Sequence, residues 1–180
     1  MVEMSDQMQV HQGKVEGAVN EMKGYIEKLD KMKPDIAALK KAYEKDPAKK
    51  AVVDNVEKFV NDLYSTGSMV FDGDEKKLIG NLNAIYKNIP ALKKNLEAIE
   101  GMLGEDLKYG KNKMKRGDIS KYTKKIIKAL GKYLKGVLTP QTVAAMDATY
   151  SNNLNGIKED YKGFKNMVKD YVGSKVVFSV

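Results

Sequence analysis

The chain has 180 residues, of which 42% are hydrophobic and 31% are charged, and its formal net charge is +8. This length suffices for one domain with a genuine core, so we expect a single helical domain over residues 1–180. The absence of cysteine excludes disulfides, thiolate catalysis and cysteine-based metal sites. No apolar run is long enough to span a membrane, and residues 1–30 lack a signal-peptide pattern, so we expect a soluble, intracellular protein.

Apolar residues in the first third of the chain recur at alternating steps of four and three. This stripe comprises Val15, Val19, Met22, Ile26 and Leu29, continued by Ile36 and Tyr43. It predicts one long helix with a single buried face, and Pro34 predicts a kink or a break within it. Asp46 followed by Pro47 predicts the N-cap and first residue of a second helix, which should end near Tyr64.

The third apolar stripe is the most regular one. It comprises Leu78, Leu82, Ile85, Ile89, Leu92, Leu96, Ile99 and Leu103. The stripe predicts a long helix capped by Asp72 or Asp74 at its start and ended by Gly104. We expect a fourth helix over about 118–138 and a last one over about 140–171. Burying all these stripes predicts a mainly α fold, an antiparallel bundle of four or five long helices.

Two short segments interrupt the helical pattern. Residues 68–72 and 174–179 each follow a predicted helix and are rich in β-branched and aromatic side chains, which favour extended structure. We therefore predict that they pair as a small two-stranded β ribbon packed on one end of the bundle. The alternative is that both are ordinary helix tails whose apolar side chains are tucked inward.

The sequence offers no set of residues suited to catalysis or metal binding. Its single histidine, His11, lies in an amide-rich segment with no nucleophile or second ligand at helical spacing. Residues 72–75 (Asp-Gly-Asp-Glu) resemble the start of a calcium loop, but Lys76 and Lys77 follow where further oxygen ligands are needed. We therefore expect no metal, no cofactor, no catalytic residues and no enzymatic activity.

Positive charge is concentrated in one segment. Between Lys108 and Thr139 the chain carries eleven basic residues and one acid, Asp118, while the remainder sums to about −2 (21 Lys+Arg against 23 Asp+Glu). Residues 108–117 have no apolar periodicity and predict a mobile loop, whereas the later lysines fall on the helix face opposite the apolar stripe. The candidate polyanion-binding residues are Lys108, Lys111, Lys113, Lys115, Arg116, Lys121, Lys124, Lys125, Lys128, Lys132 and Lys135.

Three functions compete for this basic segment. Binding of a polyanion, with nucleic acid favoured, would use the lysines to neutralise phosphates and interleaved tyrosines to stack on bases. Self-assembly is the second, because residues 1–75 hold 15 acids and 11 bases and could dock on the basic segment of another copy. The third is an anionic membrane surface, which a cationic amphipathic helix could contact. All three fail if the lysines are neutralised by carboxylates of the chain itself.

Overall fold

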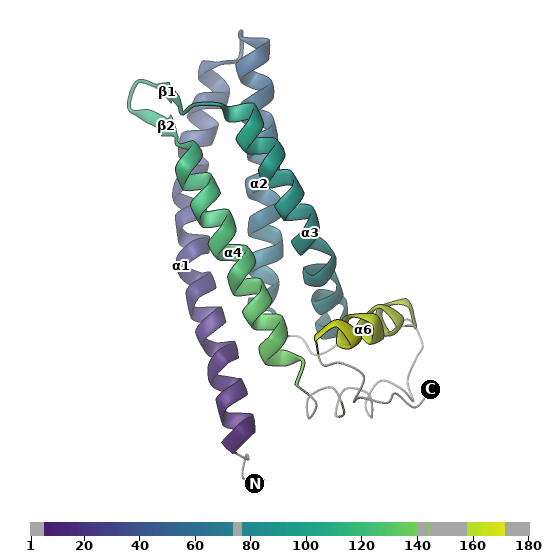
Figure 1. Ribbon diagram of the computed structural model, residues 1–180. Coiled ribbons are helices and arrows are strands. Elements are labelled where there is room, and N and C mark those ends of the chain that lie inside the picture. The colour runs from purple at the N-terminus through teal and green to yellow at the C-terminus, as the bar shows by residue number, and fades with distance from the viewer. Residues whose placement is uncertain (1–5, 74–76, 140–143, 145–157, 172–180) are drawn as a thin grey trace.

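The computed structural model of the chain describes residues 6–73, 77–139, 144 and 158–171 (Figure 1). Four long helices lie side by side: α1 (Asp6–Ala42), α2 (Pro47–Ser68), α3 (Leu78–Leu103) and α4 (Arg116–Val137). Each packs against the next along the chain, and α4 packs back on α1, which closes the bundle. A shorter helix, α6 (Lys158–Tyr171), crosses the N-terminal end of α3 (Figure 1). The mainly helical, antiparallel bundle expected from the sequence is confirmed.

The ends of the helices follow the capping signals of the sequence. Asp46 accepts a hydrogen bond at its Oδ1 from the backbone N–H of Lys49, at 3.2 Å, with Pro47 at the first helical position. Gly104 ends α3 with a φ of 54°, a conformation that glycine adopts without a Cβ penalty. At the start of α3 the expected cap by Asp72 is wrong, because the N-cap residue is Lys77 and no side chain caps the helix there. Asp72 instead accepts a hydrogen bond from the side chain of Asn81, and Asp74 lies outside the described residues.

The prolines do not break their helices. Helix α1 continues through Pro34 and α3 through Pro90, so the possibility of a break at Pro34 is wrong. An interior proline costs about 3 kcal/mol, which tertiary packing of the same helix can offset. Leu29 and Leu39, on either side of Pro34, are both fully buried, and this packing stabilises α1 on both sides of the proline.

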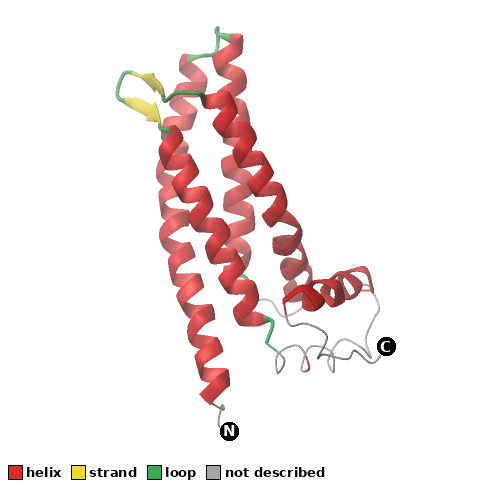
Figure 2. Cartoon of the chain, viewed as in Figure 1, coloured by secondary structure: helices red, strands yellow, loops and turns green. Residues whose placement is uncertain are grey.

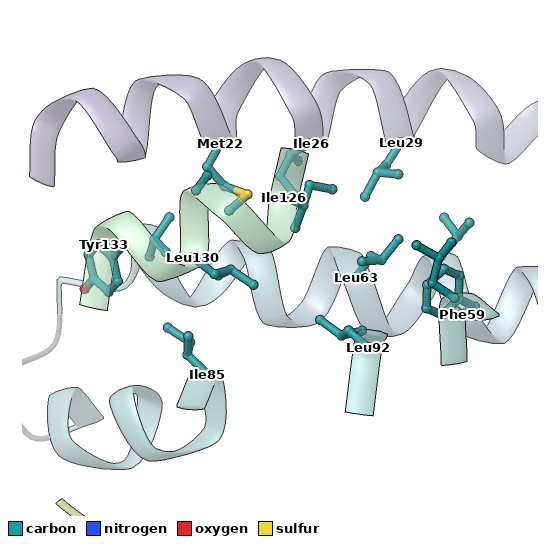
Figure 3. Close-up of a cluster of buried hydrophobic side chains, with 14 of the residues drawn as sticks. Met22, Ile26, Leu29, Phe59, Leu63, Ile85, Leu92, Ile126, Leu130 and Tyr133 are labelled. Carbon is teal, nitrogen blue, oxygen red and sulfur yellow. The ribbon is translucent and has the colours of Figure 1, made fainter. Parts of the chain in front are cut away.

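The core lies between the four long helices, on the faces that the apolar stripes predict (Figure 3). Its central side chains are Met22, Ile26 and Leu29 from α1, Phe59 and Leu63 from α2, Ile85 and Leu92 from α3, and Ile126, Leu130 and Tyr133 from α4. Two glycines allow close helix contacts: a Cβ on Gly67 would lie 2.9 Å from Met22 Sδ, and one on Gly136 would lie 2.7 Å from Val15 Cγ2.

The position of the β ribbon differs from the prediction. Ser68 ends α2 and Met69–Phe71 forms a short 3-10 helix, η1, so only Asp72 of residues 68–72 has an extended backbone and this half of the predicted pairing is wrong. Val70 is buried in the 3-10 turn, so its apolar side chain leaves water without the segment pairing as a strand. The other half, 174–179, lies outside the described residues.

A ribbon forms instead inside the basic segment (Figure 2). Strands β1 (Leu107–Tyr109) and β2 (Asn112–Met114) pair in antiparallel register, with Leu107 opposite Met114 and Lys108 opposite Lys113. Gly110, at the first position of the two-residue turn, has a φ of 61°, as a type II′ hairpin requires. Much of segment 108–117, expected to be a loop, is thus a hairpin, and its mobility stays a prediction.

Candidate polyanion-binding surface

All eleven candidate basic side chains are exposed, and they lie on the hairpin and on α4. The hairpin is amphipathic, because alternate strand residues point to opposite faces. Leu107 and Met114 share the face on which Met114 is buried, whereas Lys108 and Lys113 share the other. Along α4 the lysines occupy the side opposite Ile119, Ile126 and Leu130, which are buried in the bundle.

Few carboxylates of the chain neutralise these cations. Lys132 Nζ lies 3.2 Å from Glu21 Oε1 on α1, and Arg116 Nη2 lies 3.9 Å from Glu100 Oε2 on α3. Within the described part of the chain, the other nine cations form no ion pair. The positive charge of the segment is therefore largely uncompensated by described neighbours.

Arg116 differs from the lysines because it joins α3 to α4. Its backbone N–H donates to Asp106 Oδ1 at 3.0 Å, and its Nε donates to the backbone carbonyl of Glu100, also at 3.0 Å. The same Glu100 side chain accepts from Ser120 Oγ at 3.3 Å. These contacts give Arg116 a structural role, so its substitution would disturb the fold as well as the charge.

Two like charges face each other across the hairpin. Lys108 and Lys113 are paired residues of the two strands, and like charges in that position destabilise a ribbon. Tyr43, the residue directly after α1, contacts the ribbon in spite of this repulsion: its Oη donates a 2.6 Å hydrogen bond to the carbonyl oxygen of Lys108, and its ring meets the Tyr109 ring edge to face. A bound anion between the two ammonium groups would relieve the repulsion.

The tyrosines of the segment divide into buried and accessible ones. Tyr133 is a core residue, and its burial, together with the nearby charge of Asp72, raises the pKa of its phenol. Tyr122 is half-buried, and Lys121 Nζ lies 5.8 Å from its ring centroid. On the facing helix α1, the half-buried Tyr25 has Lys125 Nζ 5.9 Å from its ring. Tyr109 is 57% exposed on the hairpin.

A recess of about 220 Å³ lies where α1, β2 and the start of α4 meet. Its apolar part is formed by Met32, Ile36, Met114, Ile119 and Tyr122. Four lysines line it, Lys113 and Lys115 from the hairpin segment and Lys28 and Lys31 from α1, together with Asp35 and Asp118. The two α1 lysines and Tyr25 were not predicted as site residues, because periodicity does not reveal which helices are neighbours.

A larger groove of about 1080 Å³ runs between α3 and α4. Its floor includes Ile89, Leu96 and Ile127. Its basic side chains are Lys93 from α3 and Lys124, Lys128, Lys132 and Lys135 from α4. Four of the six α4 lysines therefore line this groove, whereas Lys113 and Lys115 line the recess. Lys93 is a further cation that the sequence pattern did not single out.

Among the described residues, no three histidine or acidic side chains come together in a way that could hold a metal ion. None of the described helices combines the length and the apolar composition needed to cross a membrane. The side chain of His11 lies outside the described part of the chain.

Comparisons with known protein families, with curated proteins and with solved structures find no match to this chain. The function must therefore be inferred from the surface that the fold creates. That surface comprises the exposed lysines of the hairpin and α4, together with the lysines of α1 and α3 that line the recess and the groove.

Proposed function

We propose that this protein is a non-enzymatic binding protein whose lysine surface contacts a polyanion, with nucleic acid as the favoured ligand. The observation that carries the proposal is the lack of described carboxylate partners for nine of the eleven exposed cations. Exposed charges that the fold leaves uncompensated attract oppositely charged ligands over about a Debye length, roughly 10 Å at moderate salt.

The spacing of the cations suits an extended ligand. From Lys121 to Lys135 the α4 axis rises about 21 Å at about 1.5 Å per residue, and the hairpin lysines extend this row beyond the helix start. Lysine ammonium groups act as point charges, which suit contact with a phosphate backbone better than the reading of individual bases. The ligand is therefore expected to be recognised chiefly by its charge, and its affinity should fall steeply with salt.

Charge reversal on the hairpin tests the proposal. Replacing Lys111, Lys113 and Lys115 by Glu should abolish retention of the protein on DNA or heparin at low salt. Arg116 is left intact because it joins α3 to α4. A control with Lys58, Lys87 and Lys94 replaced by Glu has the same net charge, and Lys58 lies in a separate groove between α2 and α3. Equal loss of retention in both variants, or none in either, would count against a site on the hairpin.

Two alternatives remain for the same surface. Self-assembly would bring an acidic N-terminal region onto the lysines of another copy, and multi-angle light scattering at low salt without added polyanion should then detect a large species. A monomer at every salt concentration would remove that alternative. Membrane binding is disfavoured because the apolar stripe of α4, including Ile126 and Leu130, is buried in the core. Flotation with anionic liposomes tests it directly.

A further inference from the structure

We propose that the favoured ligand is single-stranded nucleic acid, and that one unpaired base enters the recess between α1, β2 and α4. This inference rests on the proposed polyanion binding and adds the class of strand and the position of a base. It follows from the recess combining an apolar, partly aromatic lining with four lysines and two aspartates, a combination that a phosphate alone does not need.

The size and lining of the recess suit a flat heteroaromatic ring. Its volume of about 220 Å³ is small and is bounded by Met32, Ile119 and the half-buried Tyr122. Stacking of a base on an aromatic side chain contributes about 1–3 kcal/mol and tolerates any base, since every base has a π face. Tyr122 is held in place by its position in α4, one turn after the buried Ile119, so little side-chain entropy is lost when a base stacks on it.

The lysines of the recess come from two elements of the fold. Lys28 and Lys31 project from α1, and Lys113 and Lys115 from the hairpin segment. Within the described part of the chain, none of these four forms an ion pair. The phosphates on either side of an inserted base could therefore each meet a lysine, while the base itself leaves water.

The two carboxylates of the recess point to a base rather than a phosphate inside it. Asp35 and Asp118 would repel a phosphate, but their oxygens can accept hydrogen bonds from an exocyclic amine. Cytosine, adenine and guanine carry such an amine. Thymine and uracil do not, and their one ring N–H lies between two carbonyl oxygens that a carboxylate repels. The recess should therefore favour amine-bearing bases.

A duplex does not fit this arrangement without cost. Its bases are stacked and paired, and extruding one of them requires a few kcal/mol. A duplex would consequently be held only by the lysines, whereas a single strand would gain both the lysine contacts and the stacking on Tyr122. The difference between the two strand forms is the property that the experiment measures.

Fluorescence anisotropy tests the inference with three labelled ligands of equal length. They are a single strand of alternating dC and dA, the same strand in a duplex with its complement, and an all-thymidine single strand. The wild-type protein should bind the dC/dA strand more tightly than the duplex or the thymidine strand. Tyr122→Leu should weaken single-strand binding about 5- to 100-fold and leave duplex binding unchanged. Tyr122→Phe, which keeps the ring, should retain the affinity.

Tyr64→Leu is the matched control, because Tyr64 is also half-buried and lies beneath a lysine, with Lys33 Nζ 3.7 Å from its ring centroid, but does not line the recess. Asp35→Asn, at a half-buried position of α1, should reduce the preference for dC/dA over thymidine. Circular dichroism should verify that each variant is folded. Equal wild-type affinity for strand and duplex, or an unchanged Tyr122→Leu variant, overturns the base recess and leaves the lysine surface standing. No binding to any of the three ligands overturns both proposals.

Discussion

The hydroxyl of Tyr43, at the end of α1, donates a 2.6 Å hydrogen bond to the backbone carbonyl of Lys108 in β1. Residues 65 positions apart in the sequence are thus joined at the point where the hairpin meets the bundle. The ring of Tyr43 also contacts Tyr109, with the two centroids 6.1 Å apart. A short ribbon is marginal by itself, so these contacts with α1 determine whether the lysines of the hairpin hold a fixed position.

Tyr43→Phe should loosen the hairpin without unfolding the bundle. The substitution removes the hydrogen bond to Lys108 and keeps the ring contact, which should cost about 0.5–1.5 kcal/mol locally. Amide hydrogen exchange of residues 107–114 should accelerate about 2- to 10-fold, while exchange in α2 stays as in the wild type. Unchanged exchange in the hairpin would mean that the hydroxyl does not hold it.

Two glycines of α4 should respond in opposite ways to alanine. A Cβ on Gly136 would meet Val15 Cγ2 at 2.7 Å and the Val15 backbone nitrogen at 3.4 Å, so Gly136→Ala should destabilise the protein by about 1–3 kcal/mol. Gly131 has no neighbour within 4 Å of that position, and Gly131→Ala should stabilise α4 by up to about 1 kcal/mol. Urea denaturation of both variants measures the difference. A Gly136→Ala variant as stable as Gly131→Ala would show that α1 can move aside.

Tyr133 should make the bundle sensitive to alkaline pH. Burial, aided by the charge of Asp72, raises the pKa of its phenol above the unfolded value of about 10. Its contribution to stability is therefore complete below about pH 10 and is lost as pH rises from there through the folded pKa. Lys40, whose pKa is raised by its hydrogen bond and charge interaction with Glu57, loses its contribution in the same direction.

The comparison of Tyr133→Phe with the wild type isolates the phenol, because Lys40 is present in both. Thermal unfolding followed by circular dichroism between about pH 9 and 11 should show a shallower fall in Tm for Tyr133→Phe than for the wild type. The exposed Tyr109, replaced by Phe, serves as the control for the loss of a hydroxyl outside the core. Parallel curves for all three proteins would contradict the assignment.

The lysines of α4 should each contribute to the salt dependence of binding. The logarithm of the association constant falls linearly with the logarithm of the salt concentration. Replacing Lys124 and Lys128 by Gln should make this fall less steep by about 1.4 for a single strand, or about 0.7 for each phosphate that is no longer neutralised. Lys58 and Lys94, replaced by Gln together, remove the same charge from other parts of the surface and should leave the slope unchanged. Affinities measured across a salt series distinguish these outcomes, and equal slopes would place the phosphates elsewhere.

Much of the bundle was predictable because burial on one face imposes its own spacing. The regular stripe of α3 marks Leu82, Leu92 and Leu96, all of which are buried. Turn chemistry likewise marked the start of α2 at Asp46 and the end of α3 at Gly104. These are local signals, and packing reinforces them.

The errors arose where local preference and context disagreed. Pro34 lowers helix propensity, but the buried residues around it hold α1 together. The high charge of segment 108–117 concealed a hairpin whose signals were the turn at Gly110 and the apolar pair Leu107 and Met114. The contribution of Lys28 to the recess depends on α1 lying against α4, which no single stretch of sequence encodes.

Arg116 is the only arginine of the chain, and its guanidinium is engaged in connecting two helices. Every other cation available on this surface is consequently a primary amine. Unlike a guanidinium, a primary amine can be acetylated, which erases its charge and leaves the side chain in place. Each acetylated lysine would thus lower the affinity for an anionic ligand a little further. The contacts of Arg116 between α3 and α4 would stay intact.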